Sequence, residues 1–317
     1  MQQAPEQYIS PSLLFNAHLQ TIYPSLFRKI EVPWLRERVT TPDSDFLDID
    51  WLKGNSKKLV IISHGLEGNS RRAYVSGMAN AFYKNGFDVL AWNYRGCSEE
   101  LNRQLRFYHS GATDDLAQVI DKAIALSRYD EINLVGFSLG GNITLKYLGE
   151  QTKLPLSLNK AVVFSVPLHL HASCIQISRP SNWIYSQRFL RSLKKKIEGK
   201  AKIYPELDVE KLKKINSILE FDDQYTAPLH GFRDAIDYYT QCSSIHFLST
   251  IKIPTLIVSA WNDPFLSKEC FPIEKLRGHP SVIFEATKHG GHCGFTSFNE
   301  NGVYWSEQRA LNFINPS

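Results

Sequence analysis

The strongest constraint on the fold is an alternation of short, strand-like apolar runs with longer segments of helical spacing. Residues 59–63 are apolar up to Ser63 and are typical of a buried parallel strand. Further strands are expected at residues 87–92, 132–136, 161–165, 255–260 and 282–286, and helices at residues 71–83, 113–127, 139–149 and 304–313. Alternation of this kind builds a parallel sheet covered on both faces by helices. The sequence therefore predicts an α/β fold with a mostly parallel central sheet.

Three other segments complete the expected organisation. Residues 37–41 and 46–52 alternate apolar and polar side chains, which favours antiparallel edge strands added to the sheet. Residues 167–248 are helical, polar and aromatic, and they fall between two core strands. We therefore expect a core made of residues 1–166 and 249–317, with an N-terminal extension over about residues 1–35. Residues 167–248 would form a helical lid or cap inserted above the carboxyl ends of the strands.

Composition narrows the class of protein. At 317 residues, 43% of them hydrophobic and 21% charged, the chain can form a single globular unit. No stretch of about 18 apolar residues predicts a membrane-spanning helix, and the N-terminus does not resemble a secretory signal. The net charge of +4 is too small to indicate nucleic-acid binding. The chain has five scattered cysteines without a CxxC pair: Cys97, Cys174, Cys242, Cys270 and Cys293. They favour neither a disulfide framework nor a zinc site, so a cytoplasmic location is expected.

The sequence GFSLG at residues 136–140 matches the pattern G-x-S-x-G. It follows an expected strand and opens an expected helix, which is the context of a nucleophile elbow. Small neighbours let the serine occupy a strained turn, and the following helix points its N–H groups at developing negative charge. The alternative is a serine that merely caps an ordinary helix. We expect Ser138 to be a nucleophile.

A serine hydroxyl needs a base within hydrogen-bond reach. In this architecture the base follows the last strand, and two histidines lie there, His289 and His292. His292 has Gly291 before it and a further glycine shortly after it, so a flexible backbone can bring its ring to the serine. We favour His292 as the base and His289 as a structural or rim histidine.

The base needs an acid to orient and stabilise it. Asp263 directly follows the expected strand at residues 255–260, although an aspartate before a proline is also a common turn residue. The order Ser138, Asp263, His292 is the order expected of α/β hydrolases. The backbone N–H groups of Leu66 and Leu139 are the expected oxyanion-hole donors, and His64 is expected to orient the first of these turns.

Taken together, these motifs resemble those of the α/β-hydrolase superfamily, and more narrowly the YheT-like hydrolases, type 4 of the AB-hydrolase families. Matching segments occur in one order along most of the chain: NAHLQT at residues 16–21, HGLEGNS at 64–70, NYRGCS at 93–98, YHSG at 108–111, the elbow, residues 220–232, NDP at 262–264 and GGH at 290–292. The resemblance implies a carboxylic-ester hydrolase with Ser138 as nucleophile, Asp263 as acid and His292 as base. Glu99 departs from the family pattern, in which glycine is common at this position. The departure bears on the expected shape of the pocket and not on the triad.

These observations predict a serine esterase that forms an acyl-enzyme from a short- to medium-chain or lipid-like acyl ester, without cofactor or metal. An acyltransferase that passes the acyl group to an alcohol or thiol remains an alternative, as does a non-catalytic binding protein of the same fold. A dehalogenase or epoxide hydrolase is disfavoured, because those enzymes have an aspartate at the nucleophile position. The expected partner is a small-molecule ester, and the oligomeric state is left open.

Two hypotheses concern the insertion at residues 167–248. Its aromatic residues suggest that it sets acyl-length preference, although most of these rings are expected to form its own core. The basic run at residues 188–202 is typical of a solvated helix face. The alternative is a weak contact between this run and anionic lipid headgroups at a membrane surface.

Overall fold

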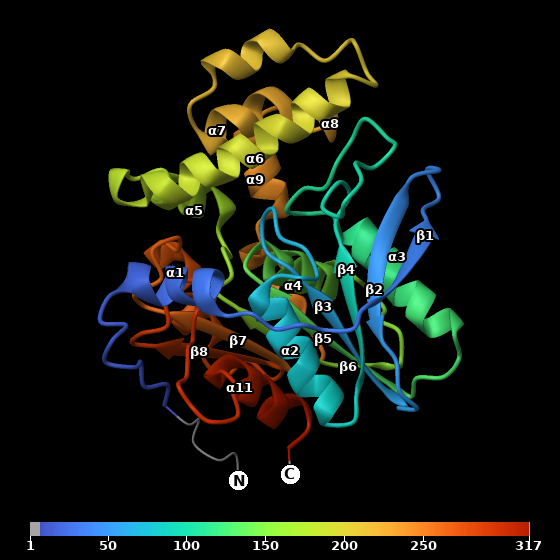
Figure 1. Ribbon diagram of the computed structural model, residues 1–317, viewed down its shortest axis with the longest axis vertical. Coiled ribbons are helices and arrows are strands. Elements are labelled where there is room, and N and C mark those ends of the chain that lie inside the picture. Colours follow the sequence, from blue (N-terminus) through green and yellow to red (C-terminus); the bar gives the residue numbers. More distant parts are fainter. Residues whose placement is uncertain (1–6, 317) are drawn as a thin grey trace.

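The central element of the computed structural model, which describes residues 7–316, is an eight-stranded sheet flanked by helices (Figure 1). Residues 1–6 of the expected N-terminal extension and Ser317 lie outside the described residues. The strands are β1 Leu35–Thr40, β2 Phe46–Leu52, β3 Lys58–Ser63, β4 Asp88–Asn93, β5 Glu131–Phe137, β6 Leu158–Phe164, β7 Thr255–Ala260 and β8 Val282–Thr287. Their order across the sheet is β1-β2-β4-β3-β5-β6-β7-β8.

Strand directions follow the two kinds of sequence pattern. Strands β3 to β8, which are apolar and mostly buried, pair in parallel. Strands β1 and β2 pair antiparallel with each other, and β2 pairs antiparallel with β4. The predicted α/β fold with antiparallel strands at one edge is confirmed.

Helices cover both faces of the sheet. Helices α2 (Ala73–Lys84) and α11 (Trp305–Ile314) share an apolar core with one face, whereas α3 (Thr113–Ala125) and α4 (Leu139–Glu150) pack on the other. The expected helices at these four places are confirmed to within a few residues. Helix α1 (Ala17–Phe27) and the short α10 (Ile273–Leu276) were not expected. Helix α1 contains a proline and exposes much of its apolar surface, so its sequence lacks the usual amphipathic stripe.

The chain between β6 and β7, residues 165–254, forms a helical insertion at the carboxyl end of the sheet (Figure 1). Its longest element is α6, Trp183–Ala201. The others are α5 Leu170–Ile177, η1 Pro180–Asn182, η2 Val209–Lys214, α7 Ile218–Phe221, the π-helical turn η3 Asp222–Thr226, α8 Ala227–Leu229, α9 Ala235–Cys242, η4 Ser244–His246 and η5 Leu248–Thr250. A separate apolar cluster lies largely within this insertion.

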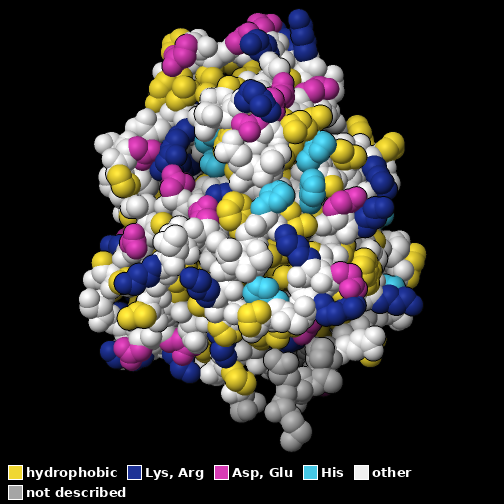
Figure 2. All heavy atoms as spheres, turned by 180° about the vertical axis from the view of Figure 1, so that it is seen from behind, with side chains coloured by type: hydrophobic (Ala, Val, Ile, Leu, Met, Phe, Trp, Pro, Cys, Tyr) yellow, Lys and Arg dark blue, Asp and Glu magenta, His cyan; other side chains and the backbone are white. Residues whose placement is uncertain are grey.

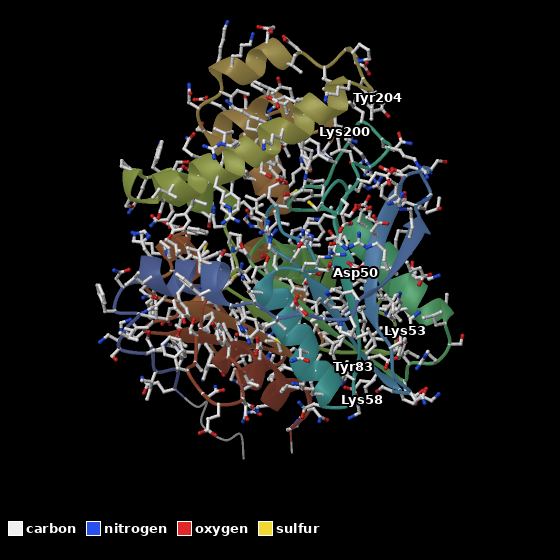
Figure 3. The ribbon with its side chains drawn as sticks, in the orientation of Figure 1. Asp50, Lys53, Lys58, Tyr83, Lys200 and Tyr204 are labelled. Atoms are coloured by element: carbon white, nitrogen blue, oxygen red, sulfur yellow. The ribbon has the colours of Figure 1, made fainter. Side chains whose placement is uncertain are left out.

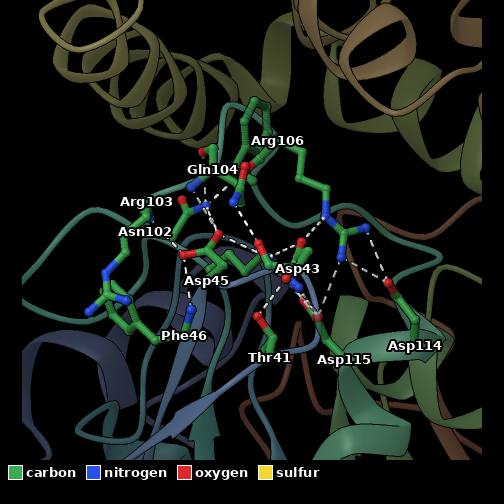
Figure 4. Close-up of polar contacts among 12 residues, drawn as sticks. Thr41, Asp43, Asp45, Phe46, Asn102, Arg103, Gln104, Arg106, Asp114 and Asp115 are labelled. Carbon is green, nitrogen blue, oxygen red and sulfur yellow. Dashed lines mark hydrogen bonds and ion pairs between the residues drawn. The ribbon is translucent and has the colours of Figure 1, made fainter.

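A buried ion network fixes the loops beside the insertion. Arg95 follows β4, and its side chain is 2% exposed. It pairs with Asp43, Asp45 and Asp115 at 2.8–2.9 Å. Figure 4 shows Asp45 also accepting a hydrogen bond from Asn102 in the loop after β4. The network therefore joins the β1–β2 turn to the 101–106 loop and to the start of α3.

Charged side chains of both signs are interspersed on the face of the molecule seen in Figure 2. Within residues 7–316, no helix combines the length and apolar character needed to cross a membrane. In the same part of the chain, no three His, Cys, Asp or Glu side chains form a group able to hold a metal ion.

Candidate active site

Ser138 occupies a strained turn between β5 and α4, with φ of 51° and ψ of −120°. Residues other than glycine rarely adopt a positive φ, and such strain is concentrated at functional sites. The Ser138 N–H donates to the carbonyl of Phe164 in β6 at 2.8 Å. A Cβ atom at Gly140 would lie 2.4 Å from the carbonyl oxygens of Ser63 and His64. Glycine at that position therefore lets α4 approach β3 closely enough to form the turn.

His292 lies in the loop after β8, and its ring bridges the other two predicted site residues. Its Nε2 is 3.0 Å from Ser138 Oγ, and its Nδ1 is 2.9 and 3.1 Å from the two carboxylate oxygens of Asp263. The side chain of Asp263 is 0% exposed and that of His292 is 11% exposed. The structure thus brings Ser138, His292 and Asp263 into one hydrogen-bonded chain whose inner end is buried.

Local hydrogen bonds hold Asp263 in the turn after β7. Its N–H donates to the carbonyl of Ala260 at 3.0 Å, and its Oδ1 accepts the N–H of Phe265 at 2.9 Å. Burial opposes charge on the ring of His292, but the Asp263 carboxylate outweighs burial and raises the pKa of His292 above its ordinary value. The arrangement therefore stabilises an imidazolium at His292.

His289, the other candidate histidine, has different neighbours. Its ring nitrogen lies 3.5 Å from the side-chain amide of Asn262, and its carbonyl accepts a hydrogen bond from Thr287. Of the two histidines, only His292 makes a hydrogen bond with Ser138 among the described residues.

Helix α1 positions the loop that carries His292. The Oε1 of Gln20, a side chain that is 1% exposed, accepts the N–H of Gly290 at 2.9 Å and the side-chain amide of Asn262 at 2.8 Å. The Oγ1 of Thr21 accepts the N–H of His292 at 2.9 Å. Sequence reasoning did not assign a role to either residue. The NAHLQT segment flagged them, but nothing local to it indicates partners some 270 residues away.

The two expected oxyanion donors lie on facing turns. Leu66 is in the turn after β3, and Leu139 is the first residue of α4; both border the same cavity as Ser138. Within residues 7–316, neither backbone N–H has a hydrogen-bond acceptor. The next residue, Glu67, has a φ of 52° and donates its N–H to the hydroxyl of Tyr108 at 3.0 Å, which fixes the first turn. Both N–H groups are thus available to a substrate oxygen.

His64 has a structural position in the first of these turns. Its Nδ1 donates to the carbonyl of Gly65 at 2.7 Å, and its Nε2 accepts the N–H of Tyr94 at 3.3 Å. Burial lowers the pKa of His64 to about 3, so the ring is neutral at physiological pH. These contacts orient the turn and leave no ring nitrogen for proton transfer.

A buried ion pair joins the insertion to the oxyanion turn. The Glu67 carboxylate accepts hydrogen bonds from Lys196 Nζ at 2.7 Å, from the Tyr108 hydroxyl at 2.7 Å and from Ser192. Side-chain exposure is 4% for Lys196 and 9% for Glu67. Burial opposes the charge of Glu67, but the Lys196 ammonium holds the pKa of Glu67 below its usual value. Sequence reasoning missed this pair because the basic run of α6 was expected to be solvated.

Two cavities meet at the Ser138 hydroxyl. The inner cavity, of about 120 Å³, also reaches His292 and is lined mainly by apolar residues, many of them from the insertion: Leu170, Ile177, Phe189, Leu193 and Ile218. The outer cavity, of about 550 Å³, lies among α1, the 65–74 segment and α6, and it carries several charged side chains. Ser138 is therefore bordered both by an apolar cavity and by a cavity that carries charged side chains.

Comparisons with known proteins agree with this architecture. The sequence pattern of the alpha/beta hydrolase fold family matches residues 58–297. The chain is 36% identical to "Putative esterase YheT" of Escherichia coli, over 88% of this chain and 84% of that protein. It is 30% identical to phospholipase ABHD3 of Mus musculus, over 92% of this chain and 73% of that protein. Among solved structures, the esterase Pf2001 of Pyrococcus furiosus covers 98% of each chain with a TM-score of 0.58 and 16% identity, which supports the fold alone.

Proposed function

This chain belongs to the alpha/beta hydrolase fold family, and on that premise we propose that it is a serine hydrolase that cleaves carboxylic esters. The observation that carries the proposal is the hydrogen-bonded chain from Ser138 through His292 to Asp263, with the serine on a strained turn. Relatives named as an esterase and a phospholipase support ester hydrolysis as the reaction class.

The proposed first step makes an acyl-enzyme. Ser138 Oγ attacks the ester carbonyl carbon while His292 Nε2 takes the hydroxyl proton. Asp263 stabilises the imidazolium, and the N–H groups of Leu66 and Leu139 hold the oxyanion of the tetrahedral intermediate. When the intermediate collapses, the bond to the alcohol oxygen breaks and His292 gives its proton to that oxygen. The alcohol leaves, and the acyl group remains on Ser138.

The second step releases the acid. A water molecule gives a proton to His292 and attacks the acyl carbonyl, and the oxyanion again receives the N–H groups of Leu66 and Leu139. Collapse returns the proton to Ser138 Oγ and frees the carboxylic acid. Each step uses only side chains and backbone groups of this chain, and the enzyme ends as it began.

The inner cavity supports a short- to medium-chain acyl group as the acid part of the substrate. Its walls are mainly apolar, it reaches Ser138, and its volume is about 120 Å³. Because α5 and α6 supply much of that wall, the helical insertion acts in this proposal as a lid that sets acyl length.

Labelling with a fluorophosphonate at neutral pH, followed by peptide mapping, tests the proposal without a guess at the substrate. We expect an adduct on the peptide that contains Ser138, lost in His292→Ala and retained in the matched variant His289→Ala. Protein that is folded by circular dichroism and yet remains unlabelled would contradict the proposal. Equal labelling of the two histidine variants would contradict the assignment of the base.

A further inference from the structure

The charged side chains that line the outer cavity beside Ser138 are mainly basic. Ser138 and His292 border this cavity, and the segment at residues 71–74 and the side chains of Tyr185, Arg188 and Ser192 in α6 form part of its walls. Figure 1 shows α6 passing above α1 and α2 at this end of the sheet. A cleft of one charge sign with low-dielectric walls raises the local concentration of ligands of the opposite sign.

Three of the seven Lys, Arg and Glu side chains in this lining already form ion pairs. Arg28 pairs with Glu307 at 2.5 Å. Arg71 lies 3.5 Å from Glu99. The carboxylate of Glu67, the one buried acid of the lining, is taken up by Lys196.

Among the remaining charged groups, Lys29 and Glu31 are exposed and of opposite sign. Two guanidinium groups are left, those of Arg72 and Arg188. Within residues 7–316, neither of them forms an ion pair with a carboxylate. The basic excess of the outer cavity therefore resides in this arginine pair.

The charge of Arg72 acts on the guanidinium of Arg188. Arg72 is partly buried, and its guanidinium makes one hydrogen bond, to the carbonyl of Glu67 at 3.0 Å. Arg188 is exposed, and its guanidinium makes no hydrogen bond among the described residues. Partial desolvation and then the nearby charge of Arg72 lower the pKa of Arg188. Two like charges without a carboxylate partner are destabilised, and an anion bound between them would relieve that repulsion.

We propose that Arg72 and Arg188 bind an anionic group, phosphate or carboxylate, on the alcohol part of the substrate ester. This rests on the proposed function. The guanidinium fork suits both anions because it can donate two parallel hydrogen bonds to their oxygens. The apolar inner cavity takes the acyl chain and the basic outer cavity takes the charged alcohol, so the scissile ester lies over Ser138.

Matched pairs of charged and neutral esters test this assignment. The phosphate pair is 1-hexanoylglycerol 3-phosphate and 1-hexanoylglycerol; the carboxylate pair is 3-(hexanoyloxy)propanoate and its N-methylamide. All four are assayed as monomers by release of hexanoic acid. A separate arm compares 1,2-didecanoylglycerol 3-phosphate with 1,2-didecanoylglycerol in phosphatidylcholine vesicles by release of decanoic acid, which distinguishes a lipid headgroup from a free soluble anion.

The readout is the ratio of kcat/KM for the charged ester to that for its neutral partner. Hydrogen bonds to charged groups correspond to a preference of about 10- to 100-fold for the charged member in the wild-type enzyme. We expect Arg188→Gln and Arg72→Gln each to reduce this ratio about tenfold, mainly through KM. The matched variant Arg191→Gln, an exposed arginine one turn further along α6, keeps the wild-type ratio.

The outcomes separate the inference from the function on which it rests. Equal kcat/KM for both members of both soluble pairs and of the vesicle pair, in wild-type enzyme whose Ser138 is labelled by the fluorophosphonate, would overturn the arginine site alone. A wild-type ratio of kcat/KM for the charged and neutral esters that persists in Arg188→Gln and Arg72→Gln would also overturn the arginine site alone. Absence of both labelling and hydrolysis would overturn the proposed function and the inference with it. A charge preference seen only with vesicles would support the arginine site and identify a lipid headgroup as its ligand.

Discussion

Ser138, Asp263 and His292 each follow a strand of the sheet within five residues, whereas Ser192 and Lys196 approach the same site from the middle of α6 in the insertion. Ser138 and Asp263 are held by backbone hydrogen bonds of their own turns. The loop of His292 is held by side chains of α1. The α6 residues act through side chains that cross from the insertion to the sheet. The reactive groups are thus positioned by contacts within the core, whereas the space around them is shaped by side chains of the insertion.

The insertion itself is held unequally along α6. Near its C-terminal end, the fully buried Lys200 donates to the carbonyls of Asn102 and Gln104, and the Tyr204 hydroxyl donates to the carbonyl of Arg103 (Figure 3). At its N-terminal end, Trp183 and Ile184 are 63% and 69% exposed. The C-terminal half of α6 is thus tied to the core by buried polar contacts, whereas its N-terminal end exposes apolar side chains and contacts the core through Asn182 and Tyr185.

The largest effect is expected at Ser138, the proposed nucleophile at the end of β5. Replacement of Ser138 by alanine removes the atom that forms the acyl-enzyme, so kcat should fall by about 10⁶-fold. The rate of hydrolysis of a hexanoate ester measures this fall, with Ser249→Ala, at an exposed serine of the insertion, as the control. Activity of Ser138→Ala within tenfold of wild type would contradict the assignment of the reactive groups to the strand ends, because the nucleophile would then lie elsewhere.

The next effect concerns Asp263 and pH. Asp263→Asn should lower kcat by about 10⁴-fold, since the ring of His292 loses its orientation and its stabilising charge. In the wild type the raised pKa places the rise of kcat/KM with pH above pH 6.5, because neutral His292 is the base. In Asp263→Asn the carboxylate is gone, so burial alone acts on the pKa of His292 and lowers it. The rise in fluorophosphonate labelling with pH should therefore move to lower pH.

The same pair makes stability depend on pH. Because the pKa of His292 is raised in the folded state, its pairing with Asp263 stabilises the fold below the unfolded pKa, and this stabilisation is lost as pH rises through the folded value. Denaturant titrations across that window should show the loss in the wild type and not in Asp263→Asn. If the wild type instead gained stability relative to Asp263→Asn as pH rises, Asp263 would not be the group that raises the pKa of His292.

A smaller effect is expected where the insertion meets the core. Lys196→Met leaves the Glu67 carboxylate buried without its cation, which should cost about 3–5 kcal/mol in the free energy of unfolding. It should also lower kcat by about 10²-fold by displacing the Leu66 N–H. Denaturant unfolding and ester kinetics measure both, with exposed Lys195→Met as the control. The double variant Glu67→Gln/Lys196→Met should recover part of the lost stability; no recovery would mean that the ion pair is not the cause.

The smallest expected effect tests whether the insertion selects the acyl length of the substrate. Ile177, which is 8% exposed in α5, lines the inner cavity. A larger side chain in Ile177→Phe should reduce kcat/KM for an octanoate ester about tenfold relative to an acetate ester. Ile175→Phe, at a 54% exposed position of the same helix, should keep the wild-type profile. An unchanged profile in Ile177→Phe would exclude the insertion from acyl-length selection at this point.

The parts of the molecule that could be predicted are those with a local signal. The buried strands are short apolar runs, and the turn at Ser138 carries its glycines beside it in sequence. Other features depend on distant partners. Gln20 and Thr21 contact the loop of His292, and Lys196 contacts Glu67, yet each lies far in sequence from its partner. A lysine that pairs with a buried glutamate has the same local sequence pattern as a lysine that faces water.

The tight turn around Ser138 also limits how this enzyme could change. A side chain at Gly140 would collide with backbone oxygens, and one at Gly136 would lie 2.7 Å from the Gly140 carbonyl oxygen, so neither position tolerates variation. Laboratory evolution that randomises the elbow would yield mostly inactive clones. Libraries directed to α5 and the first half of α6 would instead sample new substrates while the reactive centre is inherited unchanged.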